Sequence, residues 1–245
     1  MLALVALFLP LFPLSAVQNL ILARLRAPLV SAALLLLWPQ IGVALLHVSQ
    51  PRIPAFVVTW ALLSAAFYAL RLLTVRDLAR WAGFLASSAF ALTWGLAAQG
   101  ADMMELRLFA LWFSLPPALL ILLTGPLAQR FGAAYAGLHA GLAQQQPRLA
   151  LVLTAVVLSA VATPPFPGFF ALLNLLRGLG AAAALGVLGV WLLWGWAATR
   201  LLQGFVAGSG REIAAADLAG RSMLTYIAAL VIFAATGLQF AGGGL

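Results

Sequence analysis

The sequence contains no cysteine and no lysine among its 245 residues, and only 7% of its residues are charged. Without cysteine, disulfides, thiolate nucleophiles, iron–sulfur clusters and cysteine zinc sites are all excluded. Globular domains carry charge at about a quarter of their positions, so the low charge excludes an ordinary water-exposed fold. With 65% hydrophobic residues, we expect an all-α, polytopic integral membrane protein.

Acidic residues and histidines are also scarce, with five Asp and Glu together and two His. His47 and His139 lie 92 positions apart with no carboxylate near them in sequence, which does not form a metal-ligand pattern. Neither HExxH nor GxSxG occurs, and no paired carboxylates suggest acid–base chemistry. We therefore predict no catalytic, metal or cofactor site, and no catalysis by the chain alone.

Apolar segments long enough to cross a bilayer account for most of the chain, because roughly 20 apolar residues span the hydrocarbon core. We predict about eight transmembrane helices in a single membrane domain, residues 1–245. Four spans fall in 1–100, the next region covers 106–208, and 209–245 holds the last loop and span. The eight spans are 2–22, 27–48, 53–73, 78–99, 106–125, 148–176, 181–205 and 222–240.

The 13 basic residues are all arginine, and they test this topology. Cytoplasmic loops of membrane proteins collect Lys and Arg. Alternate loops place ten arginines on one side: Arg24, Arg26, Arg71, Arg76, Arg80, Arg130, Arg148, Arg200, Arg211 and Arg221. The other side has Arg52, Arg107 and Arg177. The split predicts an inner (plasma) membrane protein with both termini on the non-cytoplasmic side, and it explains the net charge of +8 without nucleic acid.

The segment 159–176, SAVATPPFPGFFALLNLL, interrupts an apolar span with three prolines and Gly168. Proline removes a backbone donor and clashes with the carbonyl four residues back. Irregular backbone at membrane depth needs surrounding protein or a wet cavity, and broken helices near the midplane build many transport sites. We predict a discontinuous helix near 163–170. The first span is expected only to bend at Pro10 and Pro13, so no matching break and no inverted repeat are predicted.

The same region resembles the antiporter-like membrane subunits shared by respiratory complex I, multisubunit sodium/proton antiporters and membrane-bound hydrogenases. The resemblance covers about 137–208, less than a third of the chain. The matching residues are Gly141, Leu142, Pro147, Pro164, Pro165, Phe166, Gly168, Phe169, Arg200 and Phe205. It implies an ion-translocating membrane complex with a broken-helix scaffold.

The chain departs from this superfamily in its charge carriers. A Lys or Glu usually lies four residues after the glycine of the broken helix, and that position here is Leu172. The resemblance therefore implies an accessory or coupling subunit for proton or sodium translocation. Its partners would be the lipid bilayer, other antiporter-like membrane subunits, and a cytoplasmic redox or zinc-containing subunit. An alternative is an independent transporter of a small solute or anion, including a membrane subunit for inorganic carbon uptake.

Polar residues of the second half are the candidates for a transport path or for the broken helix itself. They are Ser159, Thr163, Pro164, Pro165, Gly168, Asn174 and Arg200. Hydroxyls and amides also bridge packed membrane helices, and Arg200 either snorkels to the interface or turns inward to bind an anion. We expect Glu105 to lie at the interface with Arg107 as its partner, and the eight tryptophans to form mostly interfacial belts.

Overall fold

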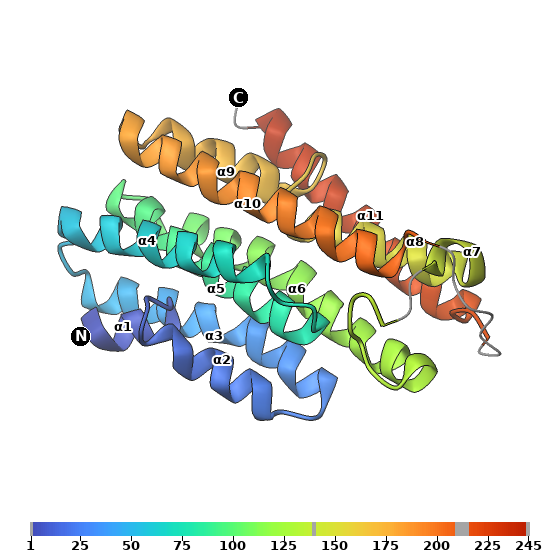
Figure 1. The fold of residues 1–245 in the computed structure, drawn as a ribbon. Helices are drawn as coiled ribbons and strands as arrows, with labels where there is room; N and C mark the ends of the chain where they lie inside the picture. Colours follow the sequence, from blue (N-terminus) through green and yellow to red (C-terminus); the bar gives the residue numbers. More distant parts are fainter. Residues whose placement is uncertain (1, 139–140, 209–215, 244–245) are drawn as a thin grey trace.

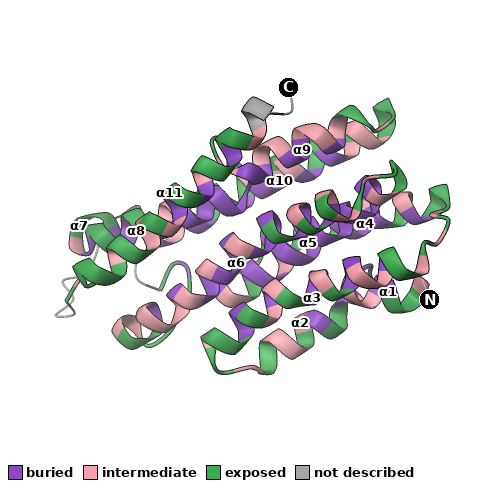
Figure 2. Ribbon diagram, turned by 180° about the vertical axis from the view of Figure 1, so that it is seen from behind, coloured by how far each residue is buried: buried purple, intermediate pink, exposed green. Residues whose placement is uncertain are grey.

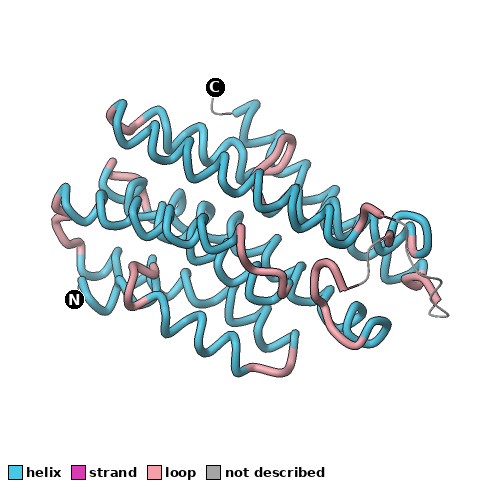
Figure 3. The backbone as a smooth tube through the Cα atoms, viewed as in Figure 1, coloured by secondary structure: helices cyan, strands magenta, loops and turns pink. Residues whose placement is uncertain are grey.

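The computed structural model describes residues 2–138, 141–208 and 216–243, and within these ranges every named element is a helix (Figure 3). The helices are α1 (Leu2–Phe8), α2 (Ser15–Arg24), α3 (Pro28–Ser49), α4 (Ala55–Leu72), α5 (Leu78–Ala98), α6 (Met103–Phe131), α7 (Leu142–Gln145), α8 (Pro147–Ala160), α9 (Pro167–Arg177), α10 (Ala181–Phe205) and α11 (Gly220–Gly243).

Six of the described helices are long and apolar enough to cross a membrane: α3, α4, α5, α6, α10 and α11. Two further expected spans are each divided into two shorter helices, α1 with α2 and α8 with α9. The chain passes back and forth through one bundle, and α1 begins at the same end at which α11 finishes (Figure 1). The prediction of an all-α polytopic membrane protein is confirmed.

The first span is broken rather than bent, which corrects the sequence-based expectation. Helix α1 ends at Phe8 and α2 begins at Ser15, with Pro10 and Pro13 in the connection. Two prolines three positions apart remove two backbone donors within one turn, so the helical ladder cannot continue through them. The prediction that the first half has no break to match the second is therefore wrong.

Helix α5 forms the centre of the bundle and is buried along almost its whole length (Figure 2). It packs against α2, α4 and α6. At the edge, α11 contacts α8 and α9 and leaves most of its apolar surface uncovered. An apolar helix face that the protein does not cover is suited to lipid or to a neighbouring membrane chain.

The connection between α6 and α7 joins the two halves of the molecule at the arginine-rich end. The backbone N–H of Ala136 donates to the carbonyl of Arg76 at 2.8 Å, and that of Gly137 donates to Gly204 at 2.8 Å. Nearby, the Arg130 side chain donates to the carbonyl of Ala216 at 3.0 Å. These contacts hold the described residues 132–138 of the connection against the α4–α5 connection and α10.

The arginine assignment agrees with this topology within the described residues. The nine described members of the larger group lie at or beside the ends of helices on the side of the α2–α3, α4–α5 and α6–α7 connections. Arg52, Arg107 and Arg177 lie at the opposite end. Arg211 lies outside the described residues. Which end faces the cytoplasm stays a prediction.

Candidate functional site

Hydrogen bonds between residues close in sequence stabilise the break between α8 and α9. The carbonyl of Leu158 accepts from the Thr163 backbone N–H at 3.3 Å and from the Thr163 hydroxyl at 3.0 Å. Ala162 is fully buried with a φ of 57°, a left-handed conformation that non-glycine residues adopt rarely. The turn is thus a defined structure, and its hydrogen bonds use a carbonyl group that the helix interruption would otherwise leave without a donor.

Helices α10 and α11 cover this second break. The indole N–H of Trp191 on α10 donates to the carbonyl of Val161 at 3.0 Å. On α11, Phe233 stacks against Phe166, with ring centroids 6.0 Å apart. A Cβ added to Gly237 would lie 2.4 Å from the carbonyl oxygen of Pro165, so the α11 backbone rests directly on the break. Two helices therefore pack against the irregular backbone, although Pro164 and Pro165 within it stay exposed.

Five of the seven candidate residues are gathered at this break. The buried Ser159 hydroxyl donates to the carbonyl of Val156 at 2.8 Å, so it is bonded to its own helix. Pro164 and Pro165 are exposed. Gly168 is buried, and a Cβ there would lie 3.3 Å from the Ala162 methyl. The glycine allows α9 to begin close to the turn.

Asn174 lies near the far end of α9, away from the break, and its partner is an acid. Its Nδ2 donates to Oε1 of Glu105 at 2.6 Å. The expected partner of Glu105 was Arg107, but the partner found among the described residues is the Asn174 amide of α9. Beside this pair, the Gln99 amide donates to the carbonyl of Leu175 at 3.0 Å.

Arg200 lies neither at the break nor beside the pair of Asn174 and Glu105. It is exposed near the end of α10 on the arginine-rich side, whereas Asn174 lies toward the opposite end of the bundle. Leu172, at the position where the resembling subunits have their charge carrier, has 0% of its surface exposed. His47 is exposed, and His139 lies outside the described residues.

The break between α1 and α2 is held mainly by tryptophans from three other helices. Trp38 donates to the carbonyl of Leu7 at 3.0 Å. Trp94 donates to the carbonyl of Leu9 at 2.9 Å, and Trp60 to that of Phe12 at 2.6 Å. Indole N–H groups thus satisfy three carbonyls that the interrupted helix leaves without a helical donor, and for Leu9 the missing donor is that of Pro13.

This arrangement corrects the expected role of the tryptophans. Trp38, Trp81, Trp94, Trp112 and Trp194 are all buried, with at most 9% of their surface exposed. Interfacial belts require rings at the protein surface, so these five do not form one. On α10, Trp194 is fully buried and donates to the Ser88 hydroxyl at 2.9 Å.

A polar cluster follows the first break on the buried side of α2. The Tyr68 hydroxyl donates to the Ser15 hydroxyl at 2.6 Å, and the Asn19 amide donates to the Ser87 hydroxyl at 2.9 Å. Gln18 is fully buried, yet neither its Oε1 nor its Nε2 has a hydrogen-bond partner among the described residues. A buried amide without partners costs about 1–3 kcal/mol or more, and water is the partner that relieves this cost.

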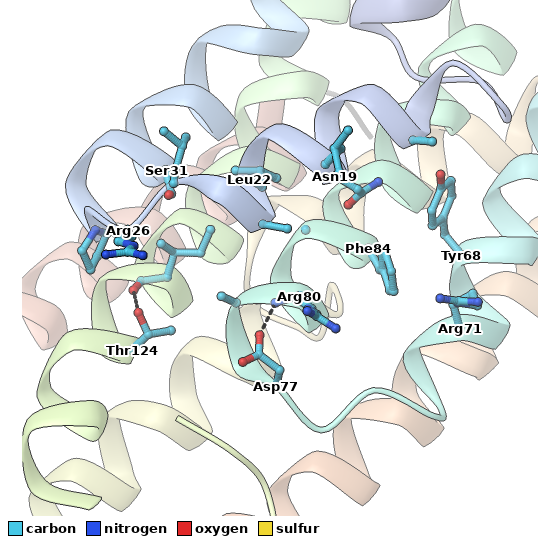
Figure 4. Close-up of a pocket in the computed structure, with 18 of the residues that line it drawn as sticks. Asn19, Leu22, Arg26, Ser31, Tyr68, Arg71, Asp77, Arg80, Phe84 and Thr124 are labelled. Carbon is cyan, nitrogen blue, oxygen red and sulfur yellow. Dashed lines mark hydrogen bonds between the residues drawn. The ribbon is translucent and has the colours of Figure 1, made fainter. Parts of the chain in front are cut away.

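A cavity of about 580 Å³ opens beside this cluster, at the arginine-rich end of α2, α4 and α5. Asn19 and Tyr68 belong both to the cluster and to the cavity wall. In Figure 4, Arg26 lies at one side of the opening, Tyr68 and Arg71 lie at the other, and Arg80 lies between them.

The interior contains no buried ionic side chain among the described residues. Its buried polar groups are serines, one threonine and two glutamines, without Asp, Glu, Arg or His. In the same part of the chain, no three His, Asp or Glu side chains group as metal ligands would. The arrangement can hold water through neutral donors and acceptors, but it offers no internal site where a fixed charge would reside.

Sequence reasoning missed the polar cluster of the first half. The available signal was the adjacent pair Gln18 and Asn19 inside an apolar segment that follows Pro10 and Pro13. Two uncharged amides are a weaker signal than the three prolines and the glycine of the second break. Tyr68 gave no separate signal, because its role depends on a contact with Ser15, 53 positions away.

Three solved structures have closely similar folds. A chain of respiratory complex I from Thermus thermophilus superposes with a TM-score of 0.83 at 22% identity, over 97% of this chain and 53% of that one. A chain of the Mrp complex from Dietzia sp. DQ12-45-1b gives 0.80 at 18% identity, over 96% and 55%. A chain of the membrane-bound sulfane sulfur reductase, an archaeal respiratory membrane complex, gives 0.77 at 16% identity, over 96% and 52%.

The chain therefore spans about half the length of the solved chains that it matches. The likeness shows that this chain shares its fold with chains of respiratory complex I and the Mrp complex, two of the kinds of complex that the resemblance names. No protein-family model and no curated protein sequence matches the chain.

Proposed function

We propose that this chain is an accessory or coupling membrane subunit of a multisubunit ion-translocating complex, with other antiporter-like membrane subunits as its partners. The observation that carries the proposal is an antiporter-like fold, over about half the length of the similar solved chains, with fully buried Leu172 at the carrier position that the resemblance implies. An aliphatic side chain cannot accept or release a proton. Proton or sodium translocation would therefore need charged groups of a partner chain.

The first-half polar cluster is the part of this subunit best suited to contact the translocated ion or its water. Gln18 supports this assignment, because a buried amide without protein partners calls for water. Asn19 and Tyr68 extend the cluster to the 580 Å³ cavity. The exposed Arg200 gives less support to an independent anion transporter, since its side chain does not enter the bundle.

Isolation of the tagged chain from its native membrane in mild detergent, followed by mass spectrometry, tests the proposal. Stoichiometric antiporter-like, redox or zinc-containing subunits are the expected result, and they would also identify the coupled process. A chain that is isolated alone and that takes up a solute or anion in liposomes would overturn the accessory role in favour of an independent transporter.

A matched pair of variants tests the place of the cluster. In the isolated complex, Gln18→Leu is expected to leave assembly intact and to reduce ion translocation measured with a pH-sensitive or sodium-sensitive dye. Gln239→Leu on the exposed face of α11 is the control and should leave both unchanged. Unchanged translocation with Gln18→Leu would exclude the cluster from the path.

A further inference from the structure

The cavity between α2, α4 and α5 combines positive charge with an apolar wall. Its basic groups come from three separate segments: Arg26 from the α2–α3 connection, Arg71 from the end of α4 and Arg80 from the start of α5. The single carboxylate in the lining is Asp77. Its Oδ1 accepts from the Arg80 backbone N–H at 2.8 Å, so it caps α5.

The three guanidinium groups are available to a ligand. In the described part of the chain, none of them donates a hydrogen bond or forms an ion pair. Arg71 lies with its guanidinium carbon 5.5 Å from the centroid of the Phe84 ring, a cation–π contact that orients the group without using its donors. All three side chains are exposed. An anion could therefore accept hydrogen bonds from these guanidinium groups without breaking a hydrogen bond that they already make.

The neutral polar residues form the inner wall rather than a second binding group. Asn19 donates to the carbonyl of Ser15 and to the Ser87 hydroxyl, and the Tyr68 hydroxyl donates to the Ser15 hydroxyl. These donors are already used within the protein. Recognition of an anion in the cavity would thus rest on the arginines.

The apolar wall continues from the arginines along the outer side of the bundle. Phe12, Leu20 and Phe67 line the cavity, yet 43%, 53% and 39% of their surfaces are exposed. The rings of Phe12 and Phe67 touch, with centroids 4.8 Å apart. Phe67 lies one helical turn, about 6 Å, before Arg71 on α4. The groove therefore runs from the charged end toward the hydrocarbon depth.

We propose that this cavity binds one anionic phospholipid, with its phosphate against Arg71 and Arg80 and an acyl chain along Phe12, Leu20 and Phe67. Basic pockets between membrane helices on the positively charged side recognise anionic head groups. Guanidinium groups bind phosphate oxygens through charge-assisted hydrogen bonds. A free anion would use the arginines alone and would leave the exposed apolar wall unused.

Native mass spectrometry of the full chain, with dioleoylphosphatidylglycerol or dioleoylphosphatidylcholine added, tests this site. Wild type should retain one phosphatidylglycerol molecule at least tenfold more strongly than phosphatidylcholine. The double variant Arg71→Gln/Arg80→Gln should lose this preference. The matched control, Arg107→Gln/Arg177→Gln, removes two exposed arginines from the opposite end and should retain it.

Equal retention of the two lipids, or equal loss of the preference in both double variants, would overturn the proposal. Competition by millimolar inorganic phosphate, with full loss of lipid preference, would assign the arginines to a free anion instead. If Arg71→Gln/Arg80→Gln does not fold, the single variant Arg80→Gln serves as the test, because the Arg80 side chain is exposed and only its backbone N–H makes a described hydrogen bond. Its preference should fall at least threefold, and an unchanged preference would contradict the site.

Discussion

Nδ2 of Asn174 donates to Oε1 of Glu105 at 2.6 Å, joining α9 to the first turn of α6. The two residues lie 69 positions apart, and both are only partly exposed. Asp102 caps the same turn by accepting from the Glu105 backbone N–H at 2.7 Å. The half-helix after the second break is thus fixed at its far end by a charge-assisted hydrogen bond.

Asn174→Leu is therefore expected to lower stability by about 1–3 kcal/mol, because the partly buried carboxylate of Glu105 loses its donor. Thermal unfolding of the purified protein in detergent measures this loss. In a double-mutant cycle with Glu105→Ala, which removes the acceptor, the two effects should be non-additive by about 1 kcal/mol. Additive effects would mean that the contact does not stabilise the fold. If transport falls while stability is unchanged, Asn174 serves the path instead.

The tryptophan contacts to the first break lead to a second prediction. Trp94→Phe keeps an aromatic ring but removes the donor to the carbonyl of Leu9, and Trp94 is only 1% exposed. A buried carbonyl without a donor costs about 1–3 kcal/mol, so the melting temperature should fall. Trp196→Phe is the matched control, since 63% of that side chain is exposed. An equal effect of both substitutions would contradict the assigned role of Trp94.

How far the sequence predicted the fold differed between its two breaks. Three prolines and Gly168 within an apolar run were sufficient to predict the second break, since no helix can continue through them. Pro10 and Pro13 were interpreted as a bend, although two prolines near the beginning of a span have the same local effect. What separates a bend from a break is the supply of outside donors, such as Trp94, and those lie 85 positions away.

The candidate site was less predictable than the fold for a similar reason. Ser159 and Thr163 were rightly placed at the break, but their hydrogen bonds to their own helix depend on local geometry. Asn174 and Glu105 lie 69 positions apart, and no sequence pattern links them, so their contact could not be predicted. The water requirement of Gln18 appears only once every neighbour of its amide is known.

Close packing of α11 on the second break leads to a third prediction. In Gly237→Ala the new Cβ would lie 2.4 Å from the Pro165 carbonyl oxygen and 2.7 Å from the Pro167 nitrogen, both backbone atoms. Such contacts force α11 away from the break, at a cost of about 1–3 kcal/mol. The yield of monodisperse protein and its melting temperature should both fall.

The control for this substitution is Gly195→Ala on α10, where a Cβ meets nothing within 4 Å. Alanine favours a helix over glycine by about 1 kcal/mol, so this variant should be at least as stable as the parent. If Gly237→Ala behaves like Gly195→Ala, α11 does not rest on the break as described.

The fourth prediction concerns the position where the resembling subunits have a charge carrier. Leu172 has no exposed surface and is part of the continuous apolar core. Leu172→Lys would bring an ammonium group into that core without a described carboxylate in the buried interior to pair with it, at a cost of about 3 kcal/mol or more. Leu172→Met keeps the volume and should cost less than about 1.5 kcal/mol. Melting temperatures of the two variants in the same detergent compare these costs. If the two variants have the same melting temperature, water or a counter-charge reaches position 172. The absence of a charge carrier there would then no longer support an accessory role.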